Sequence, residues 1–255
     1  MNIAIITGAS SGMGRELVRQ ISGHEKFDEI WIIARRADRL AELKEEIETP
    51  LRPIEMDLTK ADSMERFRDL LEFARPNVRL LANVSGYGRF GTVEKVPVED
   101  SLNMIDLDVR ALVALTELTL PYMQKGARIL EWSSLSAFQP VPYLNIYAAS
   151  KAFVLSYARA LNVELKSREI RVMAVCPYWT DTEFFEHANK TDPKAVTEFE
   201  VMYQPEQVVA QVLHDLEHTN KDVSICGGRA KFQRILVKLL PHRLVMKLWL
   251  RRQHH

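Results

Sequence analysis

The sequence predicts an α/β fold, a doubly wound parallel sheet of about seven strands with helices on both faces. Short apolar, β-branched segments alternate along the chain with longer segments of helical periodicity. The first apolar segment, residues 3–7, leads directly into a turn rich in glycine. Alternation of this kind is typical of parallel strands joined by right-handed helical crossovers.

Each expected strand is a run of four to six mainly apolar residues, a length that suits a buried strand. In chain order the strands cover residues 3–7, 30–34, 52–56, 80–84, 128–132, 171–176 and 222–225. The segments between them are longer, which favours helices that cross from strand to strand. The expected helices cover residues 15–20, 39–48, 63–73, 100–123, 147–167 and 205–218.

Composition narrows the class of protein. A chain of 255 residues with 47% hydrophobic residues fits one α/β domain. Positive and negative charges balance at 34 each, so no global field favours a nucleic-acid partner. No apolar run approaches the ~20 residues that cross a bilayer. Two cysteines, Cys176 and Cys226, and no apparent secretory segment lead us to expect a reducing, cytoplasmic setting.

The turn after the first expected strand is a candidate phosphate-binding loop. Glycines let the chain turn tightly and let backbone N–H groups approach a phosphate, which the following helix N-terminus also attracts. The alternative is a glycine-rich strand-to-helix turn without a ligand. The candidate cofactor contacts in this loop are Gly8, Ser10, Ser11, Gly12, Met13 and Gly14.

A tyrosine and a lysine four residues apart, Tyr147 and Lys151, lie on one face of an expected helix. The ammonium group would stabilise a phenolate and lower the pKa of the phenol from its ordinary value of about 10. The hydroxyl of Ser134 would complete a site that moves a proton on or off an alcohol oxygen. Ser133 is an alternative for that role, since spacing alone does not separate the two serines.

Taken together and in this order, the loop Thr7–Gly14, the segment Asn83–Gly86, Ser134 and the Tyr147–Lys151 pair resemble the short-chain dehydrogenase/reductase family. The separation of thirteen residues between Ser134 and Tyr147 also fits that family. The resemblance covers residues 2 to about 228. It implies a Rossmann fold, a nicotinamide cofactor, a small-molecule carbonyl or alcohol substrate, and a homo-oligomer, either a dimer or a tetramer.

The resemblance also implies roles for the central residues. Tyr147 would act as general acid in reduction and as base in oxidation, and Lys151 would hold the nicotinamide ribose and favour the tyrosinate. Ser134 would donate a hydrogen bond to the developing alkoxide. Asp108 stands where the family usually has an asparagine that joins a proton relay. An ionised aspartate cannot donate as an amide does, so we expect a shifted pH profile.

Further cofactor contacts follow from the resemblance. Residues at the end of the third strand would bracket the adenine, and the Asn83–Gly86 segment would lie near the ribose. The segment after the sixth strand would meet the nicotinamide amide and the diphosphate. The residues implied are Asp57, Leu58, Asn83, Ser85, Gly86, Pro177, Thr180 and Thr182, together with Tyr147 and Lys151.

The end of the second expected strand predicts which cofactor binds. NAD enzymes of this fold place a carboxylate about 20 residues beyond the glycine loop. Here Arg35 and Arg36 follow that strand, and the first acid is Asp38. Guanidinium binds phosphate in a two-pronged fashion, whereas a carboxylate repels it. We therefore expect NADP(H), with Arg35 as main contact, Arg36 second, and Arg15 adding positive charge. The alternative is that the arginines are solvated surface charges.

The substrate side is expected to be apolar. Residues 183–204 form a long polar segment with interspersed aromatics, which in this family is the mobile lid over the substrate. Tyr178 replaces a glycine of the family pattern and adds bulk there. An aromatic wall suits a hydrophobic ketone, aldehyde or secondary alcohol, although such residues can equally pack the lid onto the sheet. The candidate lining residues are Tyr87, Leu135, Tyr143, Tyr178 and Trp179.

The C-terminal segment, residues 229–255, differs from the catalytic domain that we expect over residues 1–228. It carries eight lysine and arginine residues among apolar ones. A basic amphipathic helix can cover a substrate pocket, form a subunit contact, or lie on an anionic membrane. We favour the covering role and keep peripheral membrane contact as the alternative.

Two other functions stay open alongside the reductase. A catalytically weak relative could bind NADP(H) as a sensor or scaffold, and a lipid carbonyl reductase could dock to membrane by its tail. The pattern from His214 to His218 matches a short metalloprotease motif. No further ligand accompanies it, so we expect no metal site.

Overall fold

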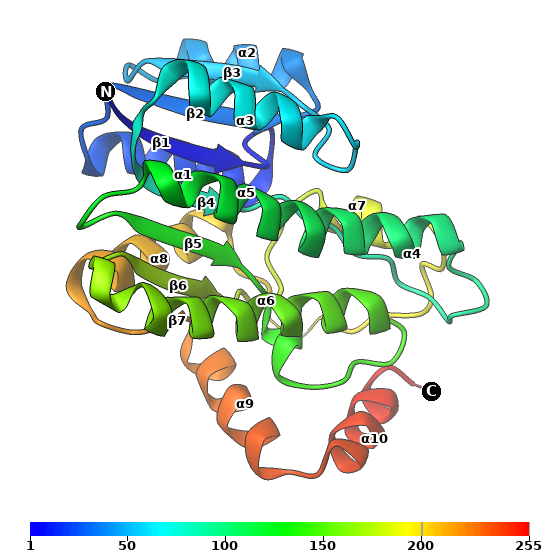
Figure 1. Ribbon diagram of the computed structural model, residues 1–255. Coiled ribbons are helices and arrows are strands. Elements are labelled where there is room, and N and C mark those ends of the chain that lie inside the picture. The colour runs from blue at the N-terminus through cyan, green and yellow to red at the C-terminus, as the bar shows by residue number, and fades with distance from the viewer. Residues whose placement is uncertain (200, 255) are drawn as a thin grey trace.

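The computed structural model describes residues 1–199 and 201–254. Seven parallel strands form one sheet in the order β3-β2-β1-β4-β5-β6-β7, which confirms the predicted doubly wound fold (Figure 1). Every strand lies within three residues of its predicted bounds. The strands are β1 (Asn2–Thr7), β2 (Glu29–Ala34), β3 (Leu51–Glu55), β4 (Asn77–Asn83), β5 (Arg128–Trp132), β6 (Arg171–Val175) and β7 (Val223–Ser224).

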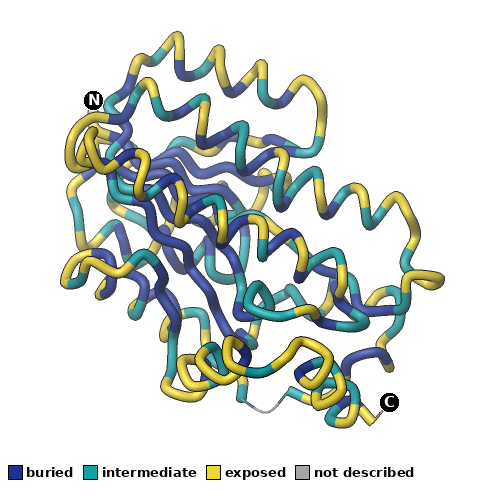
Figure 2. Tube along the Cα trace, turned by 60° about the horizontal axis from the view of Figure 1, so that its bottom comes forward, coloured by how far each residue is buried: buried dark blue, intermediate teal, exposed yellow. Residues whose placement is uncertain are grey.

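Helices cover both faces of the sheet, which is why strands such as β1 and β2 are continuously apolar rather than alternating. In β1, Ile3 and Ile5 pack into one core cluster and Ala4 and Ile6 into the other. Figure 2 shows the buried sheet between layers of helices whose outer residues are exposed. One face is covered by α3 (Ser63–Ala74), α5 (Leu112–Thr119) and α6 (Asn145–Glu164), the other by α1 (Gly12–His24), α2 (Ala37–Glu46) and α8 (Pro205–His218).

The topology places a crevice at the carboxyl ends of the strands. The strand order reverses direction at β1, whose neighbours are β2 on one side and β4 on the other. Ligands of doubly wound folds bind at such a switch point. Pro53 fits this arrangement because β3 is an edge strand, where a missing N–H removes no ladder hydrogen bond.

The expected helix over residues 100–123 is interrupted. It consists of α4 (Val98–Ile105), a π-helical turn η1 (Asp106–Ala111), α5 and a 3-10 turn η2 (Leu120–Tyr122). A π-helical turn widens the helix locally and occurs frequently at functional sites. The interruption contains Asp108, so the backbone departs from regular helix at a predicted site residue.

The C-terminal segment forms two helices, α9 (Gly228–Leu239) and α10 (His242–Arg252), below the sheet in Figure 1. The residue before Pro241 is restricted to extended conformations, which accounts for the break between them. The remaining short elements are η3 (Leu135–Phe138), η4 (Leu165–Arg168) and α7 (Phe184–Ala188). Among the described residues, no helix combines the length and apolarity needed to cross a bilayer.

The second tail helix packs on the segment predicted to be a lid. Gln253 Oε1 accepts hydrogen bonds from the backbone N–H groups of Thr197 and Glu198, at 2.9 and 3.1 Å. The indole N–H of Trp249 donates to the carbonyl of Pro142 at 3.0 Å. The end of the chain therefore holds part of residues 183–204 in place.

Candidate active site

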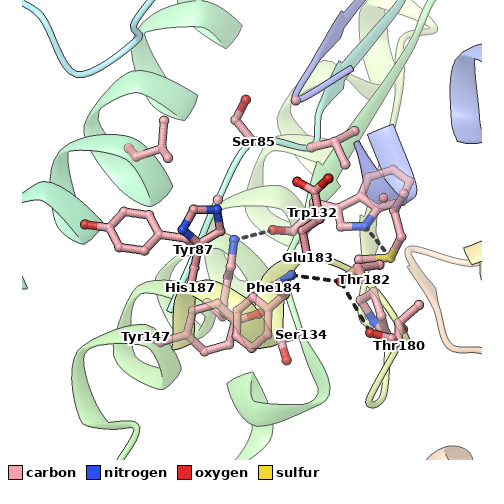
Figure 3. A pocket seen from close by; sticks show the side chains of 18 of the residues that line it. Ser85, Tyr87, Trp132, Ser134, Tyr147, Thr180, Thr182, Glu183, Phe184 and His187 are labelled. Carbon is pink, nitrogen blue, oxygen red and sulfur yellow. Dashed lines mark hydrogen bonds between the residues drawn. The ribbon is translucent and has the colours of Figure 1, made fainter. Parts of the chain in front are cut away.

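A cavity of about 590 Å³ lies at the carboxyl ends of the strands (Figure 3). Its walls come from the glycine loop, the ends of β2 to β6, the start of α6, the segment 183–190 and the tail. Sequence segments that are far apart therefore meet at one site. Most of the predicted site residues line this cavity, and the exceptions are Asn83, Asp108 and Tyr143.

The glycine loop forms a cradle that fits a phosphate. A Cβ at Gly14 would lie 2.3 Å from the carbonyl oxygen of Gly8, so a side chain there would force the loop apart. Helix α1 begins at Gly12, its N-cap Ser11 makes no side-chain cap, and its first turn holds no acid. The first N–H groups of α1 are therefore available to an anion, which the helix dipole also favours. All six predicted loop residues line the cavity.

The lysine of the predicted Tyr-Lys pair is fixed from two sides. Lys151 is 3% exposed and its ammonium group donates to the carbonyl of Trp132 at 3.0 Å. Its Nζ lies 3.7 Å from Oδ2 of Asp108 and 5.5 Å from the ring centre of Tyr147. Because α6 carries both residues on one face, the cation sits between the buried carboxylate and the phenol.

The structure distinguishes the two candidate serines. The hydroxyl of Ser133 donates to the backbone carbonyl of Lys151 at 2.7 Å and is buried. The hydroxyl of Ser134 accepts from the N–H of Ser136 at 3.2 Å, which leaves its own proton available. Figure 3 shows Ser134 and Tyr147 on the same side of the cavity. Ser133 thus anchors the lysine helix, while Ser134 faces the space beside the phenol.

The pKa of Tyr147 is shifted in the direction opposite to the one expected. Burial raises it well above its ordinary value, the charge of Asp108 raises it further, and the Ser134 hydroxyl partly opposes the shift. The expectation of a lowered pKa rests on the lysine alone, whereas loss of water and the carboxylate behind the lysine both act in the opposite direction. Burial and the carboxylate therefore favour the protonated phenol in the free protein.

Asp108 lies behind the cavity wall. Its side chain is completely buried, and Oδ1 accepts the N–H of Tyr87 at 3.2 Å. Burial raises the pKa of Asp108 to about 6, although the charge of Lys151 opposes that shift. A Cβ at Gly86 would lie 2.7 Å from Oδ1 of Asp108 and 2.8 Å from Nζ of Lys151. Glycine is therefore required at residue 86 to let the backbone pass this pair.

Asn83 points into the protein. Its amide group donates to Thr116 at 2.9 Å and to the carboxyl of Glu131 at 3.1 Å. Burial raises the pKa of Glu131 to about 8, with the bonds from Thr116 and Asn83 opposing the shift. The side chain of Asn83 thus ties β4 to α5 and β5 beneath the cavity, while the next residues, Val84 to Gly86, line it.

The three arginines near the glycine loop differ in their ion pairs and in their access to the cavity. Arg35 is exposed, lines the cavity, and its side chain makes no hydrogen bond or ion pair within the described residues. Arg36 also lines it, but pairs with Glu183 at 2.8 Å and donates to the Ser10 hydroxyl. Arg15 turns away and pairs with acids of α2, including Glu42 at 3.4 Å. Of the three, Arg35 is the most available to an incoming anion.

The remaining predicted cofactor residues are ordered by local bonds. Asp57 accepts hydrogen bonds from the N–H and the hydroxyl of Thr59, at 3.1 and 2.8 Å. Burial raises the pKa of the Asp57 carboxyl, but the bonds from Thr59 outweigh burial, so that the pKa lies below its ordinary value. Thr182 accepts the N–H of Phe184 at 3.3 Å, and its methyl group faces Gly12. Leu58, Ser85, Pro177 and Thr180 line the cavity with them.

The other end of the cavity is aromatic. Tyr87, Leu135, Tyr178 and Trp179 line the cavity, and their contact with a substrate stays a prediction. Tyr143 does not line the cavity, because its backbone adopts a left-handed conformation, with φ of 65°, and its ring packs with a small apolar cluster beneath the lid. Phe184 lies against Tyr147 with ring centres 5.3 Å apart. The wall beside the phenol is therefore apolar and formed partly by the lid.

Several lining residues were not identified from the sequence. Arg89 donates to Asp100 at 2.8 Å and stacks over Tyr87, whose hydroxyl donates to Asn103 at 3.0 Å. His187 points into the cavity, and burial together with nearby Lys190 lowers its pKa. No motif marks these positions, although several of them follow the ends of predicted strands or lie in the lid. The tail adds Gln233, Trp249 and Arg252.

No cluster of three or more potential metal ligands occurs among residues 1–199 and 201–254. In particular, the side chains of His214 and His218 lie on the exposed face of α8 and are more than half exposed.

Comparison with known proteins identifies relatives of this chain. Residues 2–193 match the family model described as short chain dehydrogenase. Sulfoacetaldehyde reductase 2 of Chromohalobacter salexigens is 32% identical over 192 residues, which are 72% of this chain and 74% of that protein.

Solved structures share the fold over almost the whole chain. A short-chain dehydrogenase from Sphingobium yanoikuyae in complex with NADPH has a TM-score of 0.78 and 24% identity, covering 94% of both chains. A short chain dehydrogenase/reductase from Burkholderia phymatum in complex with NAD has a TM-score of 0.79 and 18% identity, covering 92% of both. Proteins of this shape therefore include binders of either cofactor.

Proposed function

Because this chain belongs to the short-chain dehydrogenase family, we propose that it is an NADP(H)-dependent oxidoreductase acting on a hydrophobic carbonyl compound or the corresponding secondary alcohol. The observation that carries the proposal is the meeting of Ser134, Tyr147 and Lys151 beside the glycine cradle in one cavity. A phenol, an ammonium group and a hydroxyl placed together can manage the oxygen of a reacting carbonyl.

In the reductive direction, the residues act on the carbonyl oxygen. The nicotinamide, when bound, supplies the hydride that the carbonyl carbon gains. Tyr147 gives its proton to the oxygen, and Ser134 donates a hydrogen bond to the charge that develops there. Lys151 stabilises the tyrosinate left behind. The raised pKa of Tyr147 supports this direction, since the free protein holds the proton that reduction consumes.

The cradle and its surroundings support binding of a phosphorylated dinucleotide. The open N-terminus of α1 suits a diphosphate, and Lys151 and Thr182, which line the same cavity, would donate to ribose and diphosphate oxygens. Arg35 supplies an available guanidinium at the end of β2 for a 2′-phosphate, with Arg36 beside it. No acid occupies the strand-end position that would favour the ribose hydroxyls of NAD.

The aromatic end of the cavity supports an apolar substrate. Tyr87, Trp179, Phe184 and Trp249 offer large apolar surfaces in the cavity that holds the phenol, and Phe184 lies directly against it. The name of the Chromohalobacter relative supports reduction of a carbonyl, while the size and polarity of the substrate are inferred from this wall. We therefore favour bulky ketones or aldehydes over small polar ones.

The test is oxidation of NADPH and of NADH in the presence of a panel of apolar and polar carbonyl compounds. We expect turnover with apolar compounds and a higher kcat/KM for NADPH. Arg35→Ser should reduce the NADPH preference about tenfold, the loss expected for one charge-assisted phosphate contact. Arg39→Ser is the matched control, since Arg39 pairs with Glu42 and does not line the cavity. A preference for NADH would refute the cofactor assignment.

The proposal includes a cytoplasmic homo-oligomer. Both cysteines are free thiols, which suits a reducing compartment. Leu102 and Ile105 of α4 and Phe153 of α6 are exposed apolar residues on helices that lie against each other, which supports a subunit contact there. Light scattering of the intact protein measures the assembly, and a monomer at micromolar concentration would refute it.

A further inference from the structure

Helix α9 exposes an apolar stripe to solvent. Its buried residues, Ala230 and Val237, face the protein. On the opposite face, four large apolar side chains recur at spacings of three, one and three residues, the pattern of a continuous stripe along a helix. These are Phe232, Ile235, Leu236 and Leu239, which are 65%, 58%, 39% and 77% exposed.

Helix α10 repeats this arrangement. Val245 is buried and Trp249 reaches the cavity wall, so one face of α10 is used by the protein. Leu244 and Leu248, four residues apart, are 42% and 46% exposed on the flank of α10, beside an outer face of cations. Both tail helices thus present apolar residues to water next to charged ones.

The tail is also strongly cationic. Residues 229–255 hold eight lysines and arginines and no acid, while residues 1–228 hold 26 cations and 34 acids. A neutral protein is therefore divided into a tail of formal charge +8 and a body of −8. On the outer faces, cations flank the stripes directly. They are Lys231 and Lys238 on α9, and Arg243, Lys247 and Arg251 on α10.

Another group of exposed apolar residues differs in charge. Leu102 and Ile105 of α4 lie beside the acids Glu99 and Asp106. Apolar exposure alone is therefore not what distinguishes the tail. Apolar side chains interleaved with cations, on helices at one end of the molecule, are the combination that binds anionic bilayers at their interface.

We propose that the outer faces of α9 and α10, here called the tail surface, dock this protein on an anionic lipid bilayer. The apolar stripes enter the boundary between headgroups and acyl chains, and the flanking cations contact the headgroups. A contact made by interfacial helices is peripheral and reversible. This goes beyond the proposed reductase activity and does not depend on it.

Docking through this surface would bring the cavity close to the bilayer. The inner face of α10 supplies Trp249 and Arg252 to the cavity wall, and α9 supplies Gln233. Gln253, at the end of α10, holds the lid by two backbone bonds. The same two helices therefore meet the membrane on one side and line the proposed substrate cavity on the other, which suits an apolar substrate dissolved in the bilayer.

The test is flotation of the intact protein with phosphatidylcholine vesicles, with and without phosphatidylglycerol. We expect binding to the anionic vesicles that weakens at high salt. The double variant Ile235→Ser/Leu239→Ser should bind at least roughly tenfold more weakly, because it removes two apolar side chains from the bilayer contact. The double variant Lys231→Glu/Lys238→Glu should lose at least as much, since one cation near an anionic surface changes binding about fivefold. Turnover of a water-soluble substrate should not change, because none of the four residues lines the cavity.

Matched variants elsewhere keep the test specific. Phe73→Ser/Val163→Ser removes two apolar residues that are 88% and 72% exposed outside the tail, and Lys26→Glu/Lys44→Glu reverses two exposed charges there. Both controls should float like the wild-type protein. Three outcomes would overturn the proposal. They are absence of flotation with anionic vesicles, equal loss in controls and tail variants, and a tail surface shown by light scattering to bind a second copy instead of vesicles.

Discussion

Two lysines in different regions of the molecule differ in burial and in the groups that surround them. Lys151 is 3% exposed at the cavity and is held by the carbonyl of Trp132 and the carboxylate of Asp108. Lys238 stands on the outer face of α9, exposed and beside Leu239. Moving a cation out of water is costly unless nearby groups replace its hydration, whereas an exposed cation keeps its water and needs no partner.

The two environments suit different functions, proton transfer at the cavity and bilayer binding at the tail surface. At the cavity, buried polar groups hold one another in a fixed geometry, which is what proton transfer to a carbonyl oxygen requires. On the tail surface, cations and apolar residues such as Lys238 and Leu239 are exposed side by side, as expected for a surface that meets something else. Mutations in the two regions should therefore affect different measurements.

The largest expected effect comes from making the same substitution at both lysines. Lys151→Met removes the cation that stabilises the tyrosinate and leaves Asp108 buried without its partner, so kcat/KM should fall by roughly 100-fold or more. Lys238→Met should leave kcat/KM within about twofold and weaken vesicle binding. Steady-state kinetics and flotation of both variants test this. If the two substitutions lowered kcat/KM equally, catalysis would not depend specifically on the lysine at the cavity.

A second prediction concerns the buried polar layer beneath the cavity. Burial raises the pKa of Glu131 to about 8. Between its ordinary value near 4.5 and 8, the folded protein keeps a proton that the unfolded chain releases. Stability must therefore fall as pH rises through this window, by up to ~1.4 kcal/mol per pH unit.

Glu131→Gln should remove that decline, because the amide cannot ionise. Its oxygen accepts from Asn83, and its NH2 group donates to the Thr116 hydroxyl, whose own proton is accepted by the carbonyl of Leu112. Urea unfolding at pH 5, 7 and 9 measures it. The variant should gain stability relative to the wild-type protein as pH rises. A parallel pH dependence of the two proteins would show that Glu131 is ionised when folded.

The smallest effect is expected at Asp108. Its charge raises the pKa of Tyr147, and its own pKa is raised to about 6 by burial. Asp108→Asn removes that charge, so the pKa of Tyr147 should fall and the pH profile of alcohol oxidation should move to lower pH, by roughly one unit or less. Initial rates of oxidation from pH 6 to 10 test it. An unchanged profile would show that Asp108 does not influence the phenol.

Much of the fold could be predicted because its signals are local. Apolar runs such as Ile3 to Ile6 are buried on both faces of the sheet, so strand identity is visible without knowledge of neighbours. The π-helical turn around Asp108 could not be predicted. It depends on packing of that carboxylate beneath Gly86 and beside Lys151, which periodicity does not report.

Site residues could be predicted where a motif fixes the position of the backbone. They could not be predicted where the direction of the side chain determines whether the residue reaches the cavity. The glycine cradle and the Tyr147–Lys151 pair lie at the cavity because loop and helix geometry place them there. Asn83 turns inward to Glu131, and Arg15 turns to α2, through pairings across the fold. The covering role expected for the tail did not identify its contacts, because which residue reaches the cavity wall, here Trp249, depends on how the tail folds back.

The most direct test of the proposed chemistry is single-turnover oxidation of NADPH by Tyr147→Phe, with NADPH binding measured on the same sample. Tyr157→Phe is the control, since Tyr157 lies on the same helix but outside the cavity. We predict that Tyr147→Phe binds NADPH normally and reduces the substrate at least 100-fold more slowly, while the control keeps wild-type rates. Near-normal reduction by Tyr147→Phe would contradict the assignment of the phenol as the proton donor.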